Sequence, residues 1–147
     1  MLTQETAALL YEVNRAVIGL RGAYRTWSAM HAISYHEMLV LYTIREYGFC
    51  TQKRVCESYQ LPRQTINNVI ARMRDVGMLV HSRADSCGRE KAFILTEAGR
   101  QYAAPLLASM DAVEARAVSL LGEEKLRQMT QLVQEYDGAL TAALEEA

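Results

Sequence analysis

The sequence predicts a mainly α-helical protein with a small β-hairpin wing, organised as a winged helix-turn-helix with further helices at both ends. Apolar residues recur at intervals of three and four over most of the chain, and alternate with polar ones only near residues 78–95. Half of the 147 residues are hydrophobic and only two are proline. We expect one domain over 1–147, with the winged helix-turn-helix at 34–96 and helical regions at 1–30 and 97–147.

Two helices are predicted before residue 50. In the first, the apolar positions 10, 13, 17 and 20 follow the alternating steps of a coiled-coil seam. Ser34, followed three residues later by Glu37, has the pattern of a capping box, which predicts the start of the second helix. Gly48 is expected to end this helix, because glycine readily adopts the left-handed conformation found there.

A short helix and a longer one follow in close succession. Thr51 is expected to cap the segment "TQKRVCESYQ", and Pro62 suits the first position of the next helix, where the missing N–H had no partner. The longer helix, 62–77, places Ile66 and Ile70 on an apolar face and polar side chains on the other. Gly77 supplies the left-handed residue that ends it.

The pattern then changes to that of a β-hairpin. Residues 78–82, "MLVHS", and 91–95, "KAFIL", are predicted as strands joined by the turn-forming segment "RADSCGRE" at 83–90. Thr96 is expected to cap a further helix, and "LGEEK" at 121–125 separates this helix from the last one. The hairpin therefore comes directly after a helix-turn-helix, which is the arrangement of a wing.

The terminal helices carry apolar seams that a core as small as that of a winged helix would not cover. Positions 102, 106, 110, 113, 117 and 120 repeat in heptad steps, and positions 126, 129, 133, 136 and 140 do the same. Pairing with the same helices of a second copy would bury these seams. We therefore expect a two-fold homodimer.

Charge is distributed unevenly along the chain. The formal net charge is −1, yet residues 52–91 contain eight basic and four acidic side chains. A basic segment in an otherwise acidic chain is typical of a module that binds a polyanion.

The N-terminus lacks the pattern of a secretory signal, no apolar run reaches membrane-spanning length, and the three cysteines show no CxxC spacing. We expect a cytoplasmic protein with no membrane partner, disulfide framework or structural zinc.

These segments resemble the MarR family of bacterial winged-helix transcriptional regulators. The resemblance covers nearly the whole chain and rests on Gly48 ahead of "TQKRVCESYQLPRQTINNVIARMRDVGML" and on the later stretch "GREKAFILTEAG". The residues at the family's motif spacing are Arg72, Gly77, Arg89, Leu95, Thr96 and Gly99. The resemblance implies a dimeric repressor that binds double-stranded DNA and is released by a small molecule or an oxidant.

One residue departs from the family pattern. The family usually has an aspartate two residues before the wing arginine, where it pairs with that arginine and shapes the wing tip. Cys87 stands at this position here. Asp85 or Glu90 could take over the pairing with Arg89.

The helix at 62–77 is expected to enter the major groove, where arginine can read guanine and glutamine or asparagine can read adenine. The alternative is a solvated polar face with ordinary surface ion pairs. The expected recognition residues are Arg63, Gln64, Thr65, Asn67, Asn68 and Arg72. Phosphate contacts are expected from Thr51, Gln52, Lys53, Arg54 and Arg74. The wing is expected to reach the minor groove with Arg83, Arg89 and Lys91.

Two modes of regulation are considered. A pocket for a planar aromatic ligand is predicted where the first two helices meet, although the same residues could simply pack that junction. Its expected members are Tyr24, Trp27, His31, Tyr35 and His36. Thiol sensing is the alternative, and Cys87 is its candidate because basic residues surround it in the sequence. No metal site is expected, because His31 and His36 are five residues apart rather than four.

No enzyme motif is recognisable: HExxH, GxSxG and a phosphate-binding glycine loop are all missing from the sequence. We therefore expect no catalytic activity and no cofactor. A winged helix that binds a protein partner instead of DNA is the remaining alternative. The polar and basic face of the helix at 62–77 favours DNA, because a helix that docks on a protein usually presents apolar anchors.

Overall fold

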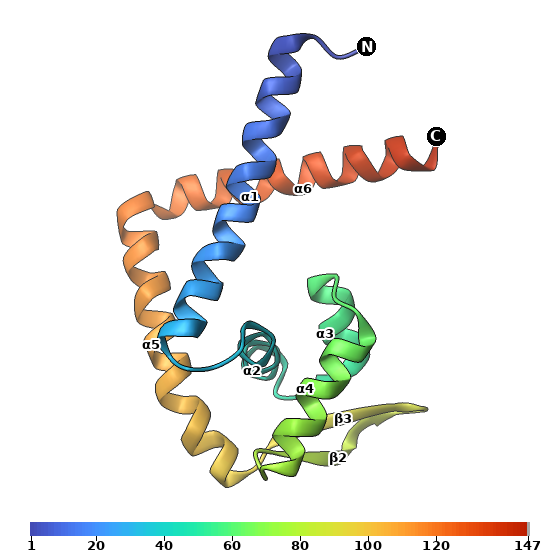
Figure 1. Cartoon of the computed structure of the whole chain (residues 1–147), viewed down its shortest axis with the longest axis vertical. Coiled ribbons are helices and arrows are strands. Elements are labelled where there is room, and N and C mark those ends of the chain that lie inside the picture. The colour runs from blue at the N-terminus through green and yellow to red at the C-terminus, as the bar shows by residue number, and fades with distance from the viewer. Residues whose placement is uncertain (147) are drawn as a thin grey trace. The chain divides into compact units, whose positions relative to one another are not determined.

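The structure is a computed structural model that describes residues 1–146, and within them six helices and the two strands of the hairpin follow the chain order predicted above, with one further strand (Figure 1). The helices are α1 (Gln4–Met30), α2 (Tyr35–Tyr47), α3 (Gln52–Tyr59), α4 (Arg63–Asp75), α5 (Glu97–Leu121) and α6 (Glu123–Glu145). The strands are β1 (Cys50–Thr51), β2 (Leu79–Cys87) and β3 (Glu90–Leu95). The predicted fold class, mainly α-helical with a small β wing, is confirmed.

The chain forms two compact units that divide after Leu107. The first unit contains α1 to α4, the three strands and the beginning of α5. The second contains the rest of α5 and α6. The expected winged helix-turn-helix at 34–96 therefore lies entirely within the first unit.

The helix boundaries follow the predicted caps closely. Thr51 accepts a hydrogen bond from the Arg54 N–H at 3.0 Å and so caps α3, and Thr96 accepts one from the Gly99 N–H at 3.0 Å and caps α5. Gly48 and Gly77 end α2 and α4 with φ of +79° and +77°. Both positions require a left-handed backbone, which explains glycine there.

The predicted capping box is only half formed. Ser34 accepts a hydrogen bond from the Glu37 N–H at 3.0 Å, as expected. The Glu37 carboxylate, however, is buried and binds Arg72 and Tyr102 instead of returning to the Ser34 backbone. A buried carboxylate is stabilised by an arginine, and this interaction outweighs the local cap. One further boundary differs: Pro62 is the N-cap of α4 rather than its first residue.

The wing differs from its prediction in length. The two strands reach Cys87 and Glu90, so the expected loop at 83–90 shrinks to a tight turn, with a bulge between Ser82 and Cys87. The Ser86 hydroxyl donates to the Ser82 carbonyl at 2.6 Å and accepts from the Ala92 N–H at 2.9 Å. This side chain replaces the missing backbone ladder, and so the hairpin continues past the turn-forming residues.

A third strand completes the sheet. β1 pairs antiparallel with β3, with Cys50 opposite Phe93 and Thr51 opposite Ala92, and the strand order is β1-β3-β2. Sequence patterns did not indicate β1, because two residues are too few to show an alternation. β1 connects α2 to α3 and fixes the base of the wing beside the helix-turn-helix.

The core of the first unit lies between α2, α3, α4 and the sheet. Its most deeply buried members, each at most 1% exposed, are Val40, Leu41, Cys50, Val55, Ile66, Met73 and Ala103. Gly99 packs directly under the end of α4: a Cβ built there would lie 2.1 Å from the Met78 carbonyl oxygen. Only glycine fits this backbone contact, which accounts for the final residue of the Leu-Thr-x-x-Gly segment.

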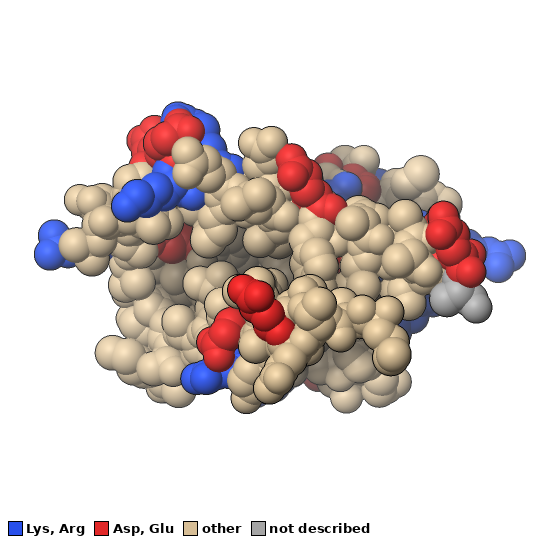
Figure 2. Space-filling model, turned by 90° about the horizontal axis from the view of Figure 1, so that it is seen from above, with Lys and Arg blue, Asp and Glu red and all other residues tan. Residues whose placement is uncertain are grey.

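The second unit contrasts with this core, because α6 has no buried residue among those described. Its exposed apolar side chains include Met129, Leu132, Val133, Tyr136, Leu140 and Leu144. In the first unit, α1 also exposes apolar residues such as Leu9, Val13 and Val17. Uncharged residues cover most of the face shown in Figure 2, and its charged side chains stand in a few separate groups. Among the described residues, no helix combines the length and apolar character needed to span a membrane.

Candidate nucleic-acid interface

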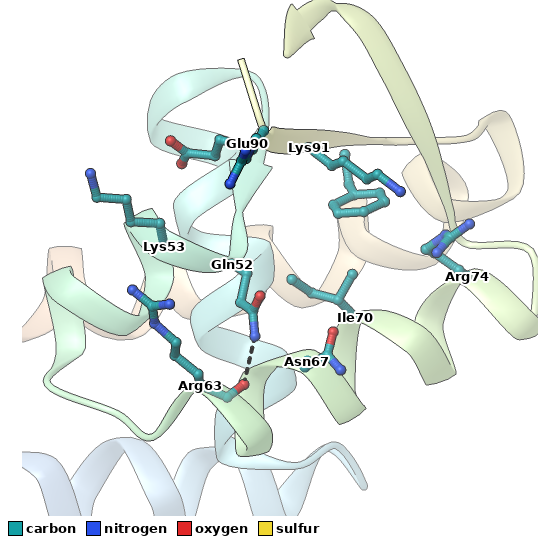
Figure 3. Close-up of a pocket in the computed structure, with 10 residues that line it drawn as sticks. Gln52, Lys53, Arg63, Asn67, Ile70, Arg74, Glu90 and Lys91 are labelled. Atoms are coloured by element: carbon teal, nitrogen blue, oxygen red, sulfur yellow. Dashed lines mark hydrogen bonds between the residues drawn. The ribbon is translucent and has the colours of Figure 1, made fainter. Parts of the chain in front are cut away.

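A basic groove separates the helix-turn-helix from the wing. It has a volume of about 430 Å³ and is lined by residues of α3, α4 and β3 and by the wing turn (Figure 3). Its charged lining residues are Lys53, Arg63, Arg74, Arg89, Lys91 and a single acid, Glu90. Figure 3 shows Lys53 and Arg63 at one end of the groove and Arg74 and Lys91 at the other. Five cations with one acid make this a strongly positive concave surface.

Burial of one face of α4 determines which side chains reach the groove. Ile66 and Ile70 are at most 3% exposed and anchor α4 against the core. With that face fixed, the helical period turns Arg63, Asn67 and Arg74 toward the wing, where they line the groove. The sequence pattern alone already indicated this exposed face.

Two hydrogen bonds hold the walls of the groove together. The Gln52 side-chain amide donates to the Arg63 carbonyl at 2.9 Å, so it connects the start of α3 to the start of α4. The Thr51 hydroxyl donates to the Glu90 carboxylate and joins the start of α3 to the wing. Thr51 is only 4% exposed, so its hydroxyl positions the two elements and does not face solvent.

Two arginines expected at the interface are engaged within the protein. Arg54 stacks on two rings, with its guanidinium carbon 4.3 Å from the Tyr47 centroid and 4.7 Å from that of Phe49. Its Nη1 atom is buried without a hydrogen-bond partner among the described residues. The guanidinium carbon of Arg74 lies 5.2 Å from the centroid of the Phe93 ring, so Arg74 links α4 to the base of the wing. Its side chain also lines the groove.

Arg72 forms an ion pair with a buried carboxylate. Its Nη2 atom donates to Glu37 at 2.6 Å, and the Tyr102 hydroxyl donates to the other oxygen of the same carboxylate at 2.8 Å. Glu37 is 3% exposed. Burial, together with the hydrogen bond to Glu37, raises the pKa of Tyr102 to about 12, so this phenol stays a donor at neutral pH. Glu37 thus joins α2, α4 and α5.

The outermost strip of α4 carries uncharged polar residues. Gln64, Asn67 and Asn68 are exposed, whereas Thr65 is half-buried. The Gln64 side-chain amide donates to the Asn68 amide oxygen at 2.8 Å. The sequence had placed all four on the recognition face, but it gave no sign of this bond.

The wing residues expected at DNA, Arg83, Arg89 and Lys91, are all exposed. The replacement of the family aspartate by Cys87 is not compensated by a nearby acid. The Asp85 carboxylate accepts from the Ser82 hydroxyl, and Glu90 accepts from Thr51. Within the described chain, neither acid forms an ion pair with Arg89, whose charge is therefore available at the wing tip.

The three thiols lie in different environments. Cys50 and Cys56 are buried, and burial raises the pKa of Cys50 to about 12 and also raises the pKa of Cys56. Such thiols carry little thiolate at neutral pH and react slowly. Cys87 is exposed at the wing turn.

In the part of the chain that is described, no group of three or more potential metal ligands is arranged to hold an ion.

A second, apolar groove of about 250 Å³ lies between α1, α2 and α3. Its lining is Leu20, Arg21, Tyr24, Tyr35, Met38, Leu39, Tyr42 and Tyr59. Of the five residues expected in a ligand pocket, Tyr24 and Tyr35 lie here. The rings of Trp27 and His31 instead stack on each other, with their centroids 4.1 Å apart. His36 does not line the groove.

The sequence prediction also missed Tyr42 and Tyr59. Tyr42 stands seven residues after Tyr35, which places the two on the same face of one helix and could have been noticed. Tyr59 reaches the groove from α3, and no local signal indicates this contact. Burial raises the pKa of Tyr59, so its phenol remains neutral in this apolar setting.

The fold and the basic groove together define a winged helix-turn-helix protein. Its positively charged surface lies between α4, the second helix of the helix-turn-helix, and the wing. Several of the solved structures that it matches are named as MarR family regulators, so the chain has the MarR fold. NMB1585, a MarR family regulator from Neisseria meningitidis, superposes with a TM-score of 0.84 at 22% identity, over 94% of this chain and 97% of that one.

Two further structures were solved with bound molecules. NadR, in complex with 4-hydroxyphenylacetate, matches with a TM-score of 0.72 at 18% identity, over 92% of this chain and 97% of that one. MepR from S. aureus, in a complex with DNA, matches with a TM-score of 0.65 at 18% identity, over 95% and 99% of the two chains. No protein-family model and no curated protein matches the sequence.

Proposed function

We propose that this protein is a sequence-specific DNA-binding transcriptional regulator, acting as a homodimeric repressor that a small molecule releases from DNA. The observation that carries the proposal is the groove in which five basic side chains of α3, α4 and the wing face one another. A helix with an exposed polar face beside such a groove suits the major groove, while the wing suits the adjacent backbone and minor groove.

The contacts divide into three roles. Lys53, Arg74 and Lys91 line the basic groove and are proposed to neutralise phosphates. Arg63 and the exposed amides of α4 are proposed to face base edges, and Arg89 the minor groove. Thr51, Gln52, Arg54 and Arg72 already interact within the chain, so we assign them to holding these elements in position.

Dimerisation is supported by the apolar side chains that α1 and α6 leave exposed in a single chain. Soluble monomers rarely display contiguous apolar surface of this kind, because covering it is favourable. A two-fold dimer would present two recognition helices to an inverted repeat.

The test of DNA binding is selection of random duplexes on the purified full chain, followed by titration of the enriched site at several salt concentrations. We expect an inverted repeat with half-sites about one helical turn apart. We also expect an affinity that falls steeply with salt, because each neutralised phosphate releases counterions. If no sequence is enriched and binding is weak at every salt concentration, the proposal is wrong and the winged helix binds a protein partner instead.

Release by a small molecule is supported by the apolar groove between α1, α2 and α3. Four tyrosines line it and Arg21 is its single charged lining residue, which suits a planar aromatic ligand bearing one negative charge. The test is thermal denaturation with a panel of aromatic acids and their neutral amides. We expect selected acids to raise the Tm by binding the folded state.

Arg21→Gln should reduce the preference for acids over amides, whereas Arg15→Gln should not. Arg15 lies on the same helix but outside the groove, and it pairs with Glu12. If no compound changes the Tm, the ligand proposal fails while the DNA-binding proposal stands.

Thiol control is the second candidate mode of release, favoured by the exposure of Cys87 while the other two thiols are buried. It predicts that peroxide releases the wild-type protein from its site and that Cys87→Ser protein stays bound. A Cys87→Ser protein that still dissociates on peroxide treatment would exclude this role for Cys87.

A further inference from the structure

Two amide side chains on the outer strip of α4 are joined by a hydrogen bond, from Gln64 Nε2 to Asn68 Oδ1 at 2.8 Å. We infer that Gln64 and Asn68 act as one unit that reads a single adenine, so that the centre of each DNA half-site contains an A·T pair. This inference rests on the proposed DNA-binding function and adds the base that the helix recognises.

The position of the pair supports this role. Gln64 and Asn68 are one helical turn apart and both exposed. They lie on the side of α4 opposite to Ile66 and Met73, which are at most 1% exposed and face the core. Both therefore belong to the strip that enters deepest when the polar face of α4 lies in a major groove.

The internal bond determines what the pair can offer a base. It uses one N–H of Gln64 and one lone pair of Asn68, and it holds the two amides side by side. The Gln64 amide oxygen and the Asn68 NH₂ group remain free, together with the second N–H of Gln64 and the second lone pair of Asn68. The unit thus presents an acceptor and a donor with little rotational freedom left to lose on binding.

Adenine is the base whose major-groove edge matches this arrangement. It presents N7 as an acceptor and the N6 amino group as a donor, so both free amide groups would be satisfied. Guanine presents two acceptors, N7 and O6. The Gln64 oxygen, itself an acceptor, would then face another acceptor with no proton to share. An unpaired polar group in a closed interface is unfavourable, so guanine should bind this arrangement more weakly than adenine does.

The surroundings of the pair also favour A·T. Ala71, exposed three residues beyond Asn68, continues the outer strip with a methyl group, which can contact the methyl of thymine. Arg72, an arginine one turn beyond Asn68 that could otherwise read guanine, is directed elsewhere, because it binds the Glu37 carboxylate.

The test compares the sites selected by the wild-type full chain with those selected by Gln64→Ala, Asn68→Ala and the double variant. In the wild type we expect an A·T pair whose replacement by G·C weakens binding about five- to 150-fold, the range for one bidentate base contact. Each single variant should lose preference at that same base pair. The double variant should lose little more than either single variant, because the two amides form one contact.

Base analogues test the same contact without changing the protein. At the assigned adenine, 7-deazaadenine removes the N7 acceptor, and 2-aminopurine moves the amino group out of the major groove. Each should weaken wild-type binding and leave the double variant unaffected. Gln101→Ala is the matched control, because Gln101 forms an exposed i,i+4 side-chain bond with Glu97 on α5, outside the groove and α4. It should preserve the full wild-type preference.

Four outcomes would overturn the inference. The first is a G·C pair at the position that the variants relax, and the second is loss of preference by the two single variants at different base pairs. The third is variants that keep every preference of the wild type. In these three cases the chain still selects a site, so the regulator proposal survives. The fourth, no selected site even for the wild type, would overturn both.

Discussion

The winged helix-turn-helix and the C-terminal helix α6 use apolar residues in opposite ways. In the former, Val40, Val55 and Ile66 are fully buried within one chain. In α6, leucine and valine side chains recur at helical spacing yet remain open, with Leu132 64% exposed and Leu140 48% exposed. The first region completes its own core, whereas the apolar residues of α6 stay open within a single chain. Similar heptad-like patterns in a sequence can therefore belong to a core or to an uncovered face, and only packing separates the two.

The largest effect is expected from a substitution on the exposed apolar face of α6, and it should appear in the dimer dissociation constant. Leu140→Asp places a carboxylate in the proposed dimer interface, and two-fold symmetry places it there twice. An uncompensated buried charge costs about 3–5 kcal/mol, so the dimer dissociation constant should rise at least about 100-fold. Sedimentation equilibrium over a dilution series measures this change.

The matched control is Gln134→Asp, which adds the same charge on α6 at a position about 120° around the helix from Leu140, outside the apolar stripe. It should leave the dimer intact. If Leu140→Asp also leaves the association unchanged, α6 is not part of the interface, and its apolar face then requires another explanation.

A matched pair of leucines compares the two regions in stability. Leu41, 1% exposed, lies in the core, while Leu132 lies on α6. Leu41→Ala should lower the free energy of unfolding by about 2–5 kcal/mol, because it removes buried contacts and leaves a cavity. Leu132→Ala should have an effect that grows with protein concentration, since in the proposed dimer the burial of Leu132 depends on a second chain. Urea denaturation at two protein concentrations checks both predictions. A loss of unfolding free energy in Leu132→Ala that does not depend on protein concentration would contradict the contrast.

A third, smaller effect is expected at the ion pair that joins α4 to the core. Arg72→Ala leaves the buried Glu37 carboxylate with Tyr102 as its remaining side-chain partner, and should destabilise the protein by about 1–3 kcal/mol. Adding Glu37→Gln should recover part of this loss, because the neutral amide needs no arginine. Urea denaturation of the single and double variants measures the coupling.

The control for this pair is Arg127→Ala, which breaks exposed ion pairs with Glu123 and Glu124 on α6. It should change stability by no more than about 0.5 kcal/mol. Equal losses for Arg72→Ala and Arg127→Ala would show that burial of Glu37 does not strengthen its pair.

Most of the fold was predictable because its signals are local. Thr51 and Thr96 cap helices through bonds that span three residues, and Gly48 and Gly77 occupy left-handed positions that few other residues tolerate. The basic segment at 52–91 also anticipated the groove, because neighbouring elements of a winged helix lie side by side.

What the sequence did not indicate depends on contacts between distant residues. Thr51 was expected to touch phosphate, but it binds Glu90, 39 residues away, and is buried. Glu37 was expected to serve a local cap, but its carboxylate meets Arg72, 35 residues away. In both cases the local pattern was correct for the backbone, while tertiary packing decided the partner of the side chain.

The smallest effect on stability is expected at the wing tip, a part of the first unit that is as exposed as α6. Arg89 forms no ion pair within the described chain, so Arg89→Ala should change the free energy of unfolding by no more than about 0.5 kcal/mol. Its effect should appear only with DNA. The affinity should fall, and the slope of log K against log salt should become shallower by about one, because one fewer counterion is released.

Arg127→Ala again provides the control, since it removes an equal charge from α6 and should leave the slope unchanged. The two variants together distinguish a local contact from a general effect of net charge. If Arg89→Ala keeps the wild-type affinity and slope, the wing tip lies outside the interface. If both variants flatten the slope equally, the effect comes from the overall field of the protein and not from the wing.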